Sequence, residues 1–191
     1  MEQGFALFET PIGLCGLAWG EQGLVGAQLP ETAPGAAWAR LRRRYPDAIE
    51  SSPPPPAIQR VIERVNDLLA GGRDDLTDID LDFSVVSPFN RRVYEIARAI
   101  PPGEILTYGQ IAKAMDDPGA ARAVGKALGE NPWPIIIPCH RVLGADGKAG
   151  GFSSPGGLQT KAKMLTIERA RTNEVPTLFD LEFSVAPKRG R

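Results

Sequence analysis

The first third of the chain alternates short apolar runs with turn residues and then changes to apolar residues at helical spacing. Within residues 5–29 the apolar runs are interrupted by the turn signals TPIG and GEQG, which predicts short β-strands. The run AAWARLRRRYP that follows predicts a short helix with Trp38, Leu41 and Tyr45 on one side. We interpret Cys15, which lies in the second apolar run, as a small buried hydrophobic residue.

A proline-rich segment, SSPPPP at residues 51–56, follows this region. Its prolines exclude a helix or sheet interior and predict a stiff linker. Beyond it a helix ending at Gly71-Gly72 is predicted, because apolar residues recur at helical spacing: Ile58, Val61, Ile62, Val65, Leu68 and Leu69. LTDIDLDFSVV then alternates apolar and acidic residues, which predicts a strand. Together these elements predict a small α/β domain over residues 1–83.

Residues 84–171 have a different pattern, in which short helices predominate. Ser87-Pro88 provides a helix cap and a first helical residue, and Pro101-Pro102-Gly103 ends that helix. The apolar face of this helix is predicted to comprise Phe89, Val93, Ile96, Ala97 and Ile100. A last amphipathic helix is predicted from about Leu158 to Arg171, and residues 172–191 are predicted to form a tail.

Two short helices in the middle of this half have the outline of a helix-turn-helix. Thr107 and Gln110 have capping-box spacing and open a helix through Met115, the break at residues 116–119 follows, and AARAVGKALGE predicts the second helix. Many small helical domains share this outline without contacting nucleic acid, so the pattern alone leaves DNA binding open. The expected fold is an α/β N-terminal domain joined to a mostly α-helical C-terminal domain.

The distribution of charge differs between the two halves. Residues 1–83 carry 7 Lys+Arg and 13 Asp+Glu, a balance of −6, whereas residues 84–191 carry 15 and 10, a balance of +5. This asymmetry suggests that only the second half faces an anionic partner, and ordinary charge scatter is the alternative.

Composition narrows the class of protein further. With 42% hydrophobic and 24% charged residues, the chain is not globally disordered. The longest apolar runs are too short for a membrane span, and the N-terminus lacks the pattern of a signal peptide. Two cysteines 124 positions apart give no disulfide framework, which favours a reducing, cytoplasmic location. With a single histidine as well, a zinc site is not expected, and no cofactor is predicted.

The stretch PIIIPCHRV, residues 134–142, contains the only histidine and one of the two cysteines. Its prolines exclude a central strand or a helix interior, so we expect Ile135–Ile137 to be buried and to fix Cys139 at the edge of the core. Cationic neighbours such as His140 and Arg141 favour the thiolate, which is the nucleophilic form of cysteine. The alternative is a buried pair with no chemistry.

Adjacent side chains do not face each other in a strand or a helix, so His140 need not contact the sulfur of Cys139 directly. If His140 removes the thiol proton, a bridging water is the expected route. A third group should then orient the imidazole. Glu168 is the candidate, because it is an acid on an otherwise basic predicted helix.

NPWPIIIPCHRV, together with ARAVGKALGE and TYGQIA upstream, resembles the O6-alkylguanine–DNA alkyltransferases, also called methylated-DNA–protein-cysteine methyltransferases. The similarity extends over SPFNRRVYEIARAIPPGEILTYGQIA and, more weakly, over the N-terminal TPIG region, so that only the tail is left out. The resemblance implies an RNase H-like N-terminal domain. It also implies irreversible transfer of an alkyl group from guanine O6 in double-stranded DNA to a cysteine of the protein.

By this resemblance, Cys139 accepts the alkyl group and His140 acts as base through a water, held by Glu168. Tyr108 of TYGQ matches the residue that donates a proton to the leaving guanine. Asn131 of NPWP matches a hinge that joins the helix-turn-helix to the active-site loop. A phenol suits the role of Tyr108, because departing guanine develops negative charge.

The resemblance also implies how DNA is bound. The target atom is buried in a duplex, so the nucleotide must be flipped out, and Arg122 matches the residue that fills the gap. Small residues such as Ala121 and Gly125 allow the second helix of the motif to enter the minor groove, which discriminates sequence poorly. Lys126 is expected to contact phosphates and to make binding salt-dependent.

The wall of the substrate pocket is where the sequence departs from the family pattern. The pocket is expected to include Pro134, Phe152 and Ser153. In GFSSPGGL, Phe152 stands where a tyrosine is frequent, and Ser154-Pro155 resembles an insertion. This departure bears on which alkyl groups are accepted and leaves the reaction type unchanged.

Other functions remain open at this point. An alkyltransferase-like protein would bind lesions without repairing them, although such relatives usually lack the cysteine. A sequence-specific regulator with a reactive cysteine and a Cys-His hydrolase are the two others. Separately, EVPTLFD in the tail loosely resembles sliding-clamp-binding peptides, so residues 175–180 are a candidate clamp contact. Packing of Leu178 and Phe179 on the protein's own surface is the alternative.

Overall fold

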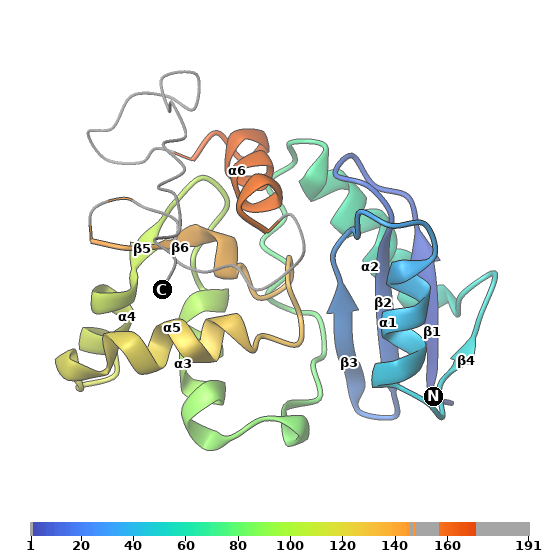
Figure 1. Cartoon of the computed structure of the whole chain (residues 1–191), viewed down its shortest axis with the longest axis horizontal. Helices are drawn as coiled ribbons and strands as arrows, with labels where there is room; N and C mark the ends of the chain where they lie inside the picture. The colour runs from blue at the N-terminus through green and yellow to red at the C-terminus, as the bar shows by residue number, and fades with distance from the viewer. Residues whose placement is uncertain (1, 146, 148–156, 171–191) are drawn as a thin grey trace, which may run out of the picture.

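The computed structural model describes residues 2–145, 147 and 157–170, which form a sheet with helices on both faces and a second group of helices beside it (Figure 1). The predicted strands of the first segment are confirmed. The sheet has the order β3-β2-β1-β4, with β1 antiparallel to β2, β2 antiparallel to β3 and β4 parallel to β1. These strands are β1 (Gly4–Phe8), β2 (Cys15–Gly20), β3 (Gly23–Gln28) and β4 (Ile49–Glu50).

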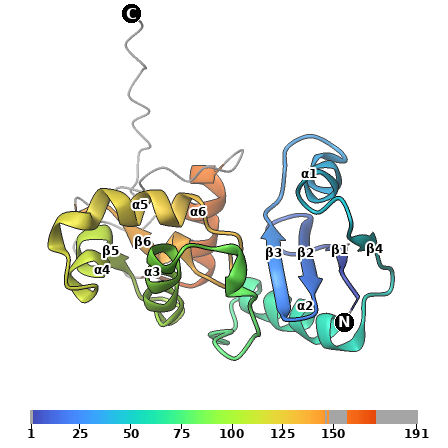
Figure 2. The ribbon, with the colours of Figure 1, turned by 90° about the horizontal axis from the view of Figure 1, so that it is seen from below.

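Helices α1 (Ala36–Arg44) and α2 (Pro56–Leu69) cover opposite faces of this sheet (Figure 2). Successive strand residues point to opposite faces, so the sheet contributes to two apolar clusters. Phe5, Ala18 and Val25 pack with Leu41 of α1, whereas Ala6, Leu17 and Trp19 belong to the larger cluster that contains the apolar face of α2. Cys15 is 1% exposed, as expected of a core residue.

Two expectations for the helices of this half were wrong in detail. Trp38 does not share the buried side of α1, because it is 42% exposed and its indole N–H donates to Glu50 over 2.8 Å. Pro56 is not part of the linker, because it is the first residue of α2, where a proline lacks no hydrogen bond that the helix needs.

The strand predicted for LTDIDLDFSVV does not form. This segment contains an isolated bridge between Leu81 and Leu24, followed by a short 3-10 helix, Phe83–Val85. The acidic side chains accept hydrogen bonds from nearby backbone N–H groups: Asp74 from Leu76, Asp75 from Thr77 and Asp82 from Ser84. Local bonds of this kind stabilise turns in competition with a strand ladder, which explains why alternation alone misled.

The described part of the second half contains the predicted helices, two short strands and two 3-10 turns. The strands β5 and β6 are parallel. The elements are α3 (Pro88–Arg98), β5 (Leu106–Thr107), α4 (Tyr108–Ala114), η2 (Pro118–Ala120), α5 (Ala121–Gly129), η3 (Cys139–Arg141), β6 (Val142–Leu143) and α6 (Gly157–Ile167).

The predicted helix caps are confirmed. The Ser87 hydroxyl accepts from the N–H of Asn90, and both hydrogen bonds of the Thr107–Gln110 capping box are present. Phe89 departs from the predicted apolar face, because it is 36% exposed. The last helix is shorter than predicted, since α6 ends at Ile167 and leaves Glu168 just beyond it.

The segment that leads to the candidate site is attached to edge strand β3. The N–H of Ala27 donates to Pro132 over 2.8 Å, and the indole N–H of Trp133 donates to Leu24 over 2.7 Å. Trp133 is fully buried in an apolar cluster that includes residues of both halves. Backbone groups that an edge strand would leave unpaired thus hold the start of PIIIPCHRV in place.

Within the described ranges, none of the helices has the length and apolar character needed to cross a bilayer. Phe152, Ser153 and the predicted tail, with its candidate clamp contact at residues 175–180, lie outside the described residues.

Candidate active site

Residues 134–142 form a tight turn followed by a single turn of 3-10 helix. The N–H of Ile137 bonds to Trp133 over 2.8 Å, a bridge joins Pro134 to Ile137, and Ile135–Ile137 are buried as expected. Ile135 has φ 79°, a left-handed conformation that costs a β-branched residue about 1–3 kcal/mol. The buried isoleucines and the attachment to β3 sustain this strain, and together they fix the position of Cys139.

The thiol of Cys139 is almost fully enclosed, with 6% of the residue exposed. Burial raises its pKa, while the Asn131 side chain, the charge of Lys161 and the backbone N–H groups of Cys139 and His140 act in the opposite direction. Cys15 lacks this set of donors, and burial raises its pKa to about 12. Cys139 is therefore a neutral thiol at rest, surrounded by groups that stabilise the thiolate once a base removes its proton.

His140, Arg141 and Glu168 form a buried cluster in which the side chains of all three are at most 3% exposed. Nε2 of His140 lies 2.9 Å from Oε1 of Glu168. The Arg141 guanidinium donates to both oxygens of the same carboxylate, at 2.8 and 2.9 Å, and also to the carbonyl of Ile100. Burial acts to raise the pKa of Glu168, but the hydrogen bonds from His140 and Arg141 outweigh it and hold the pKa at about 2.

This arrangement determines which nitrogen of His140 can accept a proton. Because the Glu168 carboxylate is ionised, the hydrogen-bond network assigns the imidazole proton to Nε2. Burial lowers the pKa of His140, so the ring is neutral and Nδ1 keeps its lone pair. Nδ1 is buried and bonds to none of the described residues. No side-chain hydrogen bond joins His140 to Cys139 in the described part of the chain, as expected of two adjacent residues whose side chains do not face each other.

Asn131 connects the end of α5 to the turn that carries Cys139. Its amide donates to the carbonyl of Ile137 and its carbonyl accepts from the N–H of Trp133, both over 2.9 Å. One half-buried side chain thus joins the two ends of the PWPIII turn, which is the location expected of a hinge.

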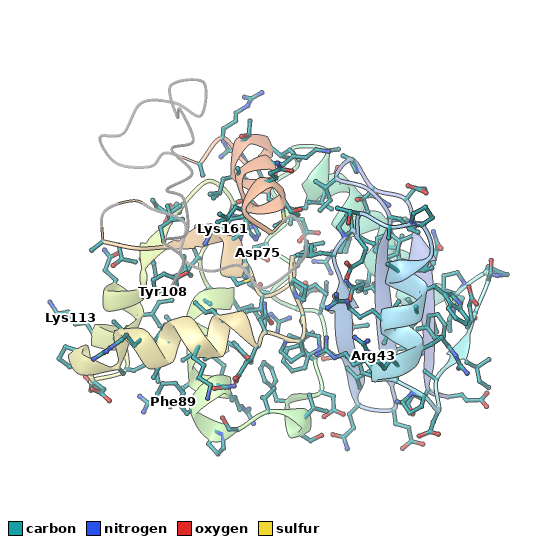
Figure 3. The ribbon with its side chains drawn as sticks, viewed as in Figure 1. Arg43, Asp75, Phe89, Tyr108, Lys113 and Lys161 are labelled. Atoms are coloured by element: carbon teal, nitrogen blue, oxygen red, sulfur yellow. The ribbon has the colours of Figure 1, made fainter. Side chains whose placement is uncertain are left out.

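Tyr108 and α5 form the border of the site. Tyr108 is the first residue of α4 and is half-buried (Figure 3). Its ring lies beside Gly125 of α5, 3.8 Å from where a Cβ on that residue would stand, which is ordinary van der Waals distance. Burial raises the pKa of Tyr108, and a negative charge on Cys139 would raise it further.

The outer face of α5 combines small residues with cations. Arg122 and Lys126 are exposed, and the residues that precede them, Ala121 and Gly125, are half-exposed. Lys126 lies 3.9 Å from Glu130, the residue just beyond the end of α5, and a surface pair of this kind contributes little to stability. This face is compatible with close approach of an anionic backbone.

Sequence reasoning missed Lys161, and it named Arg141 only as a cationic neighbour of Cys139 and missed its bonds to Glu168. Lys161 is 1% exposed, donates to the carbonyl of Val142 over 2.6 Å, and has a pKa lowered to about 8 by burial (Figure 3). Its spacing from Met164 and Leu165 placed it on the apolar face of α6, which was the available signal. Arg141 could be recognised only through its partner Glu168.

Pro134 is half-buried and lines a cleft of about 410 Å³ together with residues of α1, α5 and β3. Phe152 and Ser153, the other two predicted pocket residues, lie outside the described ranges. Among the described residues, His, Cys, Asp and Glu side chains form no group of three or more that could hold a metal ion.

Comparison with known proteins identifies relatives of both halves of the chain. Residues 88–170 match the family described as 6-O-methylguanine DNA methyltransferase, DNA binding domain. The methylated-DNA–protein-cysteine methyltransferase of Mycolicibacterium paratuberculosis is 43% identical over 127 residues, which are 66% of this chain and 74% of the relative. The protein of the same name from Mycobacterium bovis is 40% identical over 142 residues, 73% of this chain and 83% of that protein.

Solved structures agree with the sequence matches. The crystal structure of the O6-methylguanine methyltransferase of Mycobacterium tuberculosis superposes with a TM-score of 0.70 at 33% identity, covering 94% of this chain and all of that one. A structure of the M. tuberculosis protein in complex with DNA gives 0.67, also at 33% identity, over 87% and 92% of the two chains. This chain has a buried Cys139 beside a His140–Glu168 pair, and it is 40% identical to the M. bovis protein over 83% of that protein's length. The chain therefore belongs to the methylated-DNA–protein-cysteine methyltransferase family.

Proposed function

We propose that this protein repairs alkylated DNA by moving an alkyl group from O6 of guanine in a duplex to Sγ of Cys139, once per molecule. The observation that carries the proposal is the buried Cys139 next to a neutral His140 whose Nε2 is held 2.9 Å from Glu168. The relatives in other organisms are named for this reaction. The two free cysteines among the described residues agree with a reducing, cytoplasmic location.

In the proposed reaction, Nδ1 of His140 takes the thiol proton of Cys139 through a bridging water. The imidazolium that forms is stabilised by Glu168, whose carboxylate already accepts from Nε2. The thiolate is stabilised by Asn131, Lys161 and two backbone N–H groups, which compensate part of the cost of charge in a buried site. The imidazolium and the thiolate are thus each stabilised by neighbouring groups, and His140 and Cys139 need not contact each other.

The thiolate then attacks the alkyl carbon, a C–S bond forms and the C–O6 bond breaks with its electron pair passing to guanine. Tyr108 donates its phenolic proton to the departing guanine and recovers a proton from solvent. Its raised pKa keeps the phenol protonated until negative charge develops on the base. The thioether on Cys139 has no route back to the thiol, so each molecule acts once.

We assign DNA binding to α4 and α5, which are joined by a short break and correspond to the predicted helix-turn-helix. The exposed face of α5 enters the minor groove through Ala121 and Gly125, and Lys126 contacts phosphate. Arg122 fills the space left by the flipped nucleotide, and Asn131 fixes α5 relative to the reactive turn. Residues 84–171 then form the alkyltransferase domain.

In the same proposal, residues 1–83 form an N-terminal domain of RNase H-like type. The support is the mixed sheet β3-β2-β1-β4 with helices on its two faces. Through Trp133 and Pro132, this domain positions the turn that precedes Cys139.

The test is intact-mass measurement after incubation with an oligonucleotide duplex that carries O6-methylguanine. We expect a gain of one methyl group, located on Cys139, with loss of activity in proportion to the protein modified. Cys139→Ser should abolish the gain, and the matched control Cys15→Ser should retain it because Cys15 lies in the sheet core.

Two results would reject the proposal. Multiple turnovers per molecule would contradict transfer to the protein. Tight binding of the lesion with no mass gain would instead identify a protein that recognises lesions without repairing them.

A further inference from the structure

Helix α1 carries a concentrated positive charge that the acidic total of the first half conceals. Four of the seven Lys and Arg residues in positions 1–83 lie between residues 40 and 44, in the sequence RLRRR. Leu41 is buried against the sheet, whereas Arg42, Arg43 and Arg44 are exposed and Arg40 is half-exposed. The helix is therefore fixed through Ala37 and Leu41, its two buried residues, and directs its guanidinium groups outward.

These arginines differ in the partners that their guanidinium groups have within the protein. Arg40 pairs with Glu31 at 2.6 Å, and Arg42 donates to the carbonyl of Ala48. Arg44 stacks over the ring of Tyr45, and Arg43 has neither a hydrogen bond nor an ion pair with the described residues. Arg42, Arg43 and Arg44 thus have no carboxylate partner among the described residues, and Arg43 and Arg44 also lack the backbone carbonyl partners that Arg42 has (Figure 3 labels Arg43).

Cations in the last turn of a helix also stabilise its C-terminus, which by itself would explain a basic end to α1. The favourable interaction with the helix C-terminus does not explain why three of these arginines line a cleft between the two halves of the protein. Arg40, Arg43 and Arg44 line the 410 Å³ cleft whose opposite wall is Gly129–Asn131 and Pro134. The charge of Arg44 also acts on the hydroxyl of Tyr94 in α3.

The position of α1 relative to α5 indicates the ligand. Both helices lie on the same side of the molecule, whereas α2 and the acidic segment 74–82 lie on the other (Figure 2). A rod of DNA that contacts the outer face of α5 therefore passes α1 and avoids the acidic side. One carboxylate, Glu130, stands among three arginines in the intervening cleft, so the cleft has a net positive charge.

We propose that Arg43 and Arg44 bind the phosphate backbone of the same duplex that α5 engages, which makes α1 a second DNA-binding element outside the alkyltransferase domain. This inference rests on the proposed function of α5. It replaces the expectation that only the basic second half faces an anionic partner. Guanidinium groups suit the role because their planar fork matches a phosphate, and binding of this kind is independent of base sequence.

The test is the salt dependence of duplex binding, measured in a Cys139→Ser background so that no transfer occurs. A compact chain of this length has a radius of gyration of about 16 Å, and DNA rises about 3.4 Å per base pair, so an unmodified duplex of about 24 base pairs reaches past both helices. The variant is Arg43→Gln/Arg44→Gln. Arg60→Gln is the matched control, because Arg60 is exposed on α2, on the far side of the sheet.

We expect the slope of log affinity against log salt to fall by about two in the double variant, roughly one for each phosphate that the variant no longer binds. Arg43→Lys/Arg44→Lys should keep most of the slope, since lysine retains the charge, and Arg60→Gln should leave it unchanged. Melting temperatures equal to that of the parent confirm that the variants fold.

An unchanged slope in the double glutamine variant, with weakened binding by Arg122→Ala, would overturn the role of α1 and leave the proposed role of α5 intact. An equal decrease in Arg60→Gln would also overturn it, because the effect would then reflect total charge alone. If instead Arg122→Ala had no effect on binding, the assignment of α5 would be wrong, independently of α1.

Discussion

Nε2 of His140 lies 2.9 Å from Oε1 of Glu168, and that carboxylate accepts a two-pronged bond from Arg141. The hydrogen bond between His140 and Glu168 fixes the plane of the imidazole and its tautomer. The residue that orients the base thus lies 28 positions along the chain from the base itself. Arg141 belongs to the same short turn as Cys139, and its charge therefore anchors Glu168 beside the reactive turn.

Glu168→Gln tests whether the charge of this carboxylate matters to the reaction. The amide keeps the size of the side chain but does not stabilise an imidazolium, so we expect the rate of alkyl transfer to fall roughly 10²-fold. The measurement is single-turnover transfer from an O6-methylguanine duplex, with the dissociation constant for DNA expected to be unchanged. A rate equal to that of the parent would show that Glu168 has a structural role alone.

Glu168→Ala tests the stability of the same cluster. Removing the carboxylate leaves the guanidinium of Arg141 buried without its partner, and such a change costs about 3–5 kcal/mol. In Glu168→Ala/Arg141→Met the unpaired charge is absent, and we expect urea unfolding to show recovery of much of the stability. Equal destabilisation of the single and double variants would mean that the ion pair itself, rather than the orphaned charge, determines the cost.

The pH dependence of the protein follows from the direction of two shifts. Burial lowers the pKa of His140 below its ordinary value of 6.5, so the folded state binds its proton less readily than the unfolded chain. Stability is then fully present above pH 6.5 and declines as the pH falls below it. Glu168 adds a second decline at lower pH, between its ordinary pKa of 4.5 and its folded pKa of about 2.

The check is the free energy of unfolding in urea as a function of pH, with His140→Gln as the comparison. The variant should lack the decline that begins near pH 6.5. Because protonated His140 cannot act as a base, the transfer rate of the parent should fall in the same direction. A rate that rises as the pH decreases would contradict the assignment of His140 as the base.

Local signals in the sequence were sufficient for much of the fold and for the burial of the segment that carries Cys139. The Ser87 and Thr107 caps use side chains within three residues of their backbone partners, so spacing alone predicts them. The burial of Ile135–Ile137 follows from proline chemistry in the same way. The strand predicted for the acidic segment after α2 was wrong because its Asp side chains accept hydrogen bonds from the backbone of their own turns. The alternation of apolar and acidic residues does not reveal such local bonds.

The rest of the site depends on contacts between distant segments. Lys161 and Arg141 are charged residues, a type usually found at the surface, yet both are 1% exposed. Each is enclosed because a carbonyl or carboxylate from another segment satisfies it: Val142 for Lys161, and Ile100 and Glu168 for Arg141. Spacing places Lys161 on the apolar face of α6, but it does not identify the tertiary partners that allow a charge to be buried.

Thr107→Ala tests the cap that begins α4. The substitution removes the acceptor for the N–H of Gln110, and removal of an N-cap costs about 1 kcal/mol. Since Tyr108 is the next residue, the transfer rate should fall as well if the start of α4 frays. Urea unfolding and single-turnover kinetics are the two measurements, with the exposed substitution Thr32→Ala as control. A variant as stable as the parent would show that α4 is held by packing alone.

Tyr108→Phe separates the chemical role of the phenol from its packing. The ring stays against Gly125, so duplex affinity should be unchanged, whereas the proton for the departing guanine is absent. We expect the transfer rate to fall by roughly 10²-fold, the lower end of the range for general acid catalysis.

Tyr45→Phe is the matched control for this removal of a hydroxyl. It removes a hydroxyl that donates to Val25 over 2.8 Å on the α1 side of the sheet, and it should reduce stability while leaving the rate unchanged. An equal rate for Tyr108→Phe and the parent would exclude Tyr108 as the acid. A decrease in duplex affinity without a change in the bound rate would place its hydroxyl in DNA binding instead. The ordinary pKa of a phenol is 10, and burial raises that of Tyr108 above it. Deprotonation of Tyr108 should therefore not reduce the transfer rate of the parent protein below pH 10.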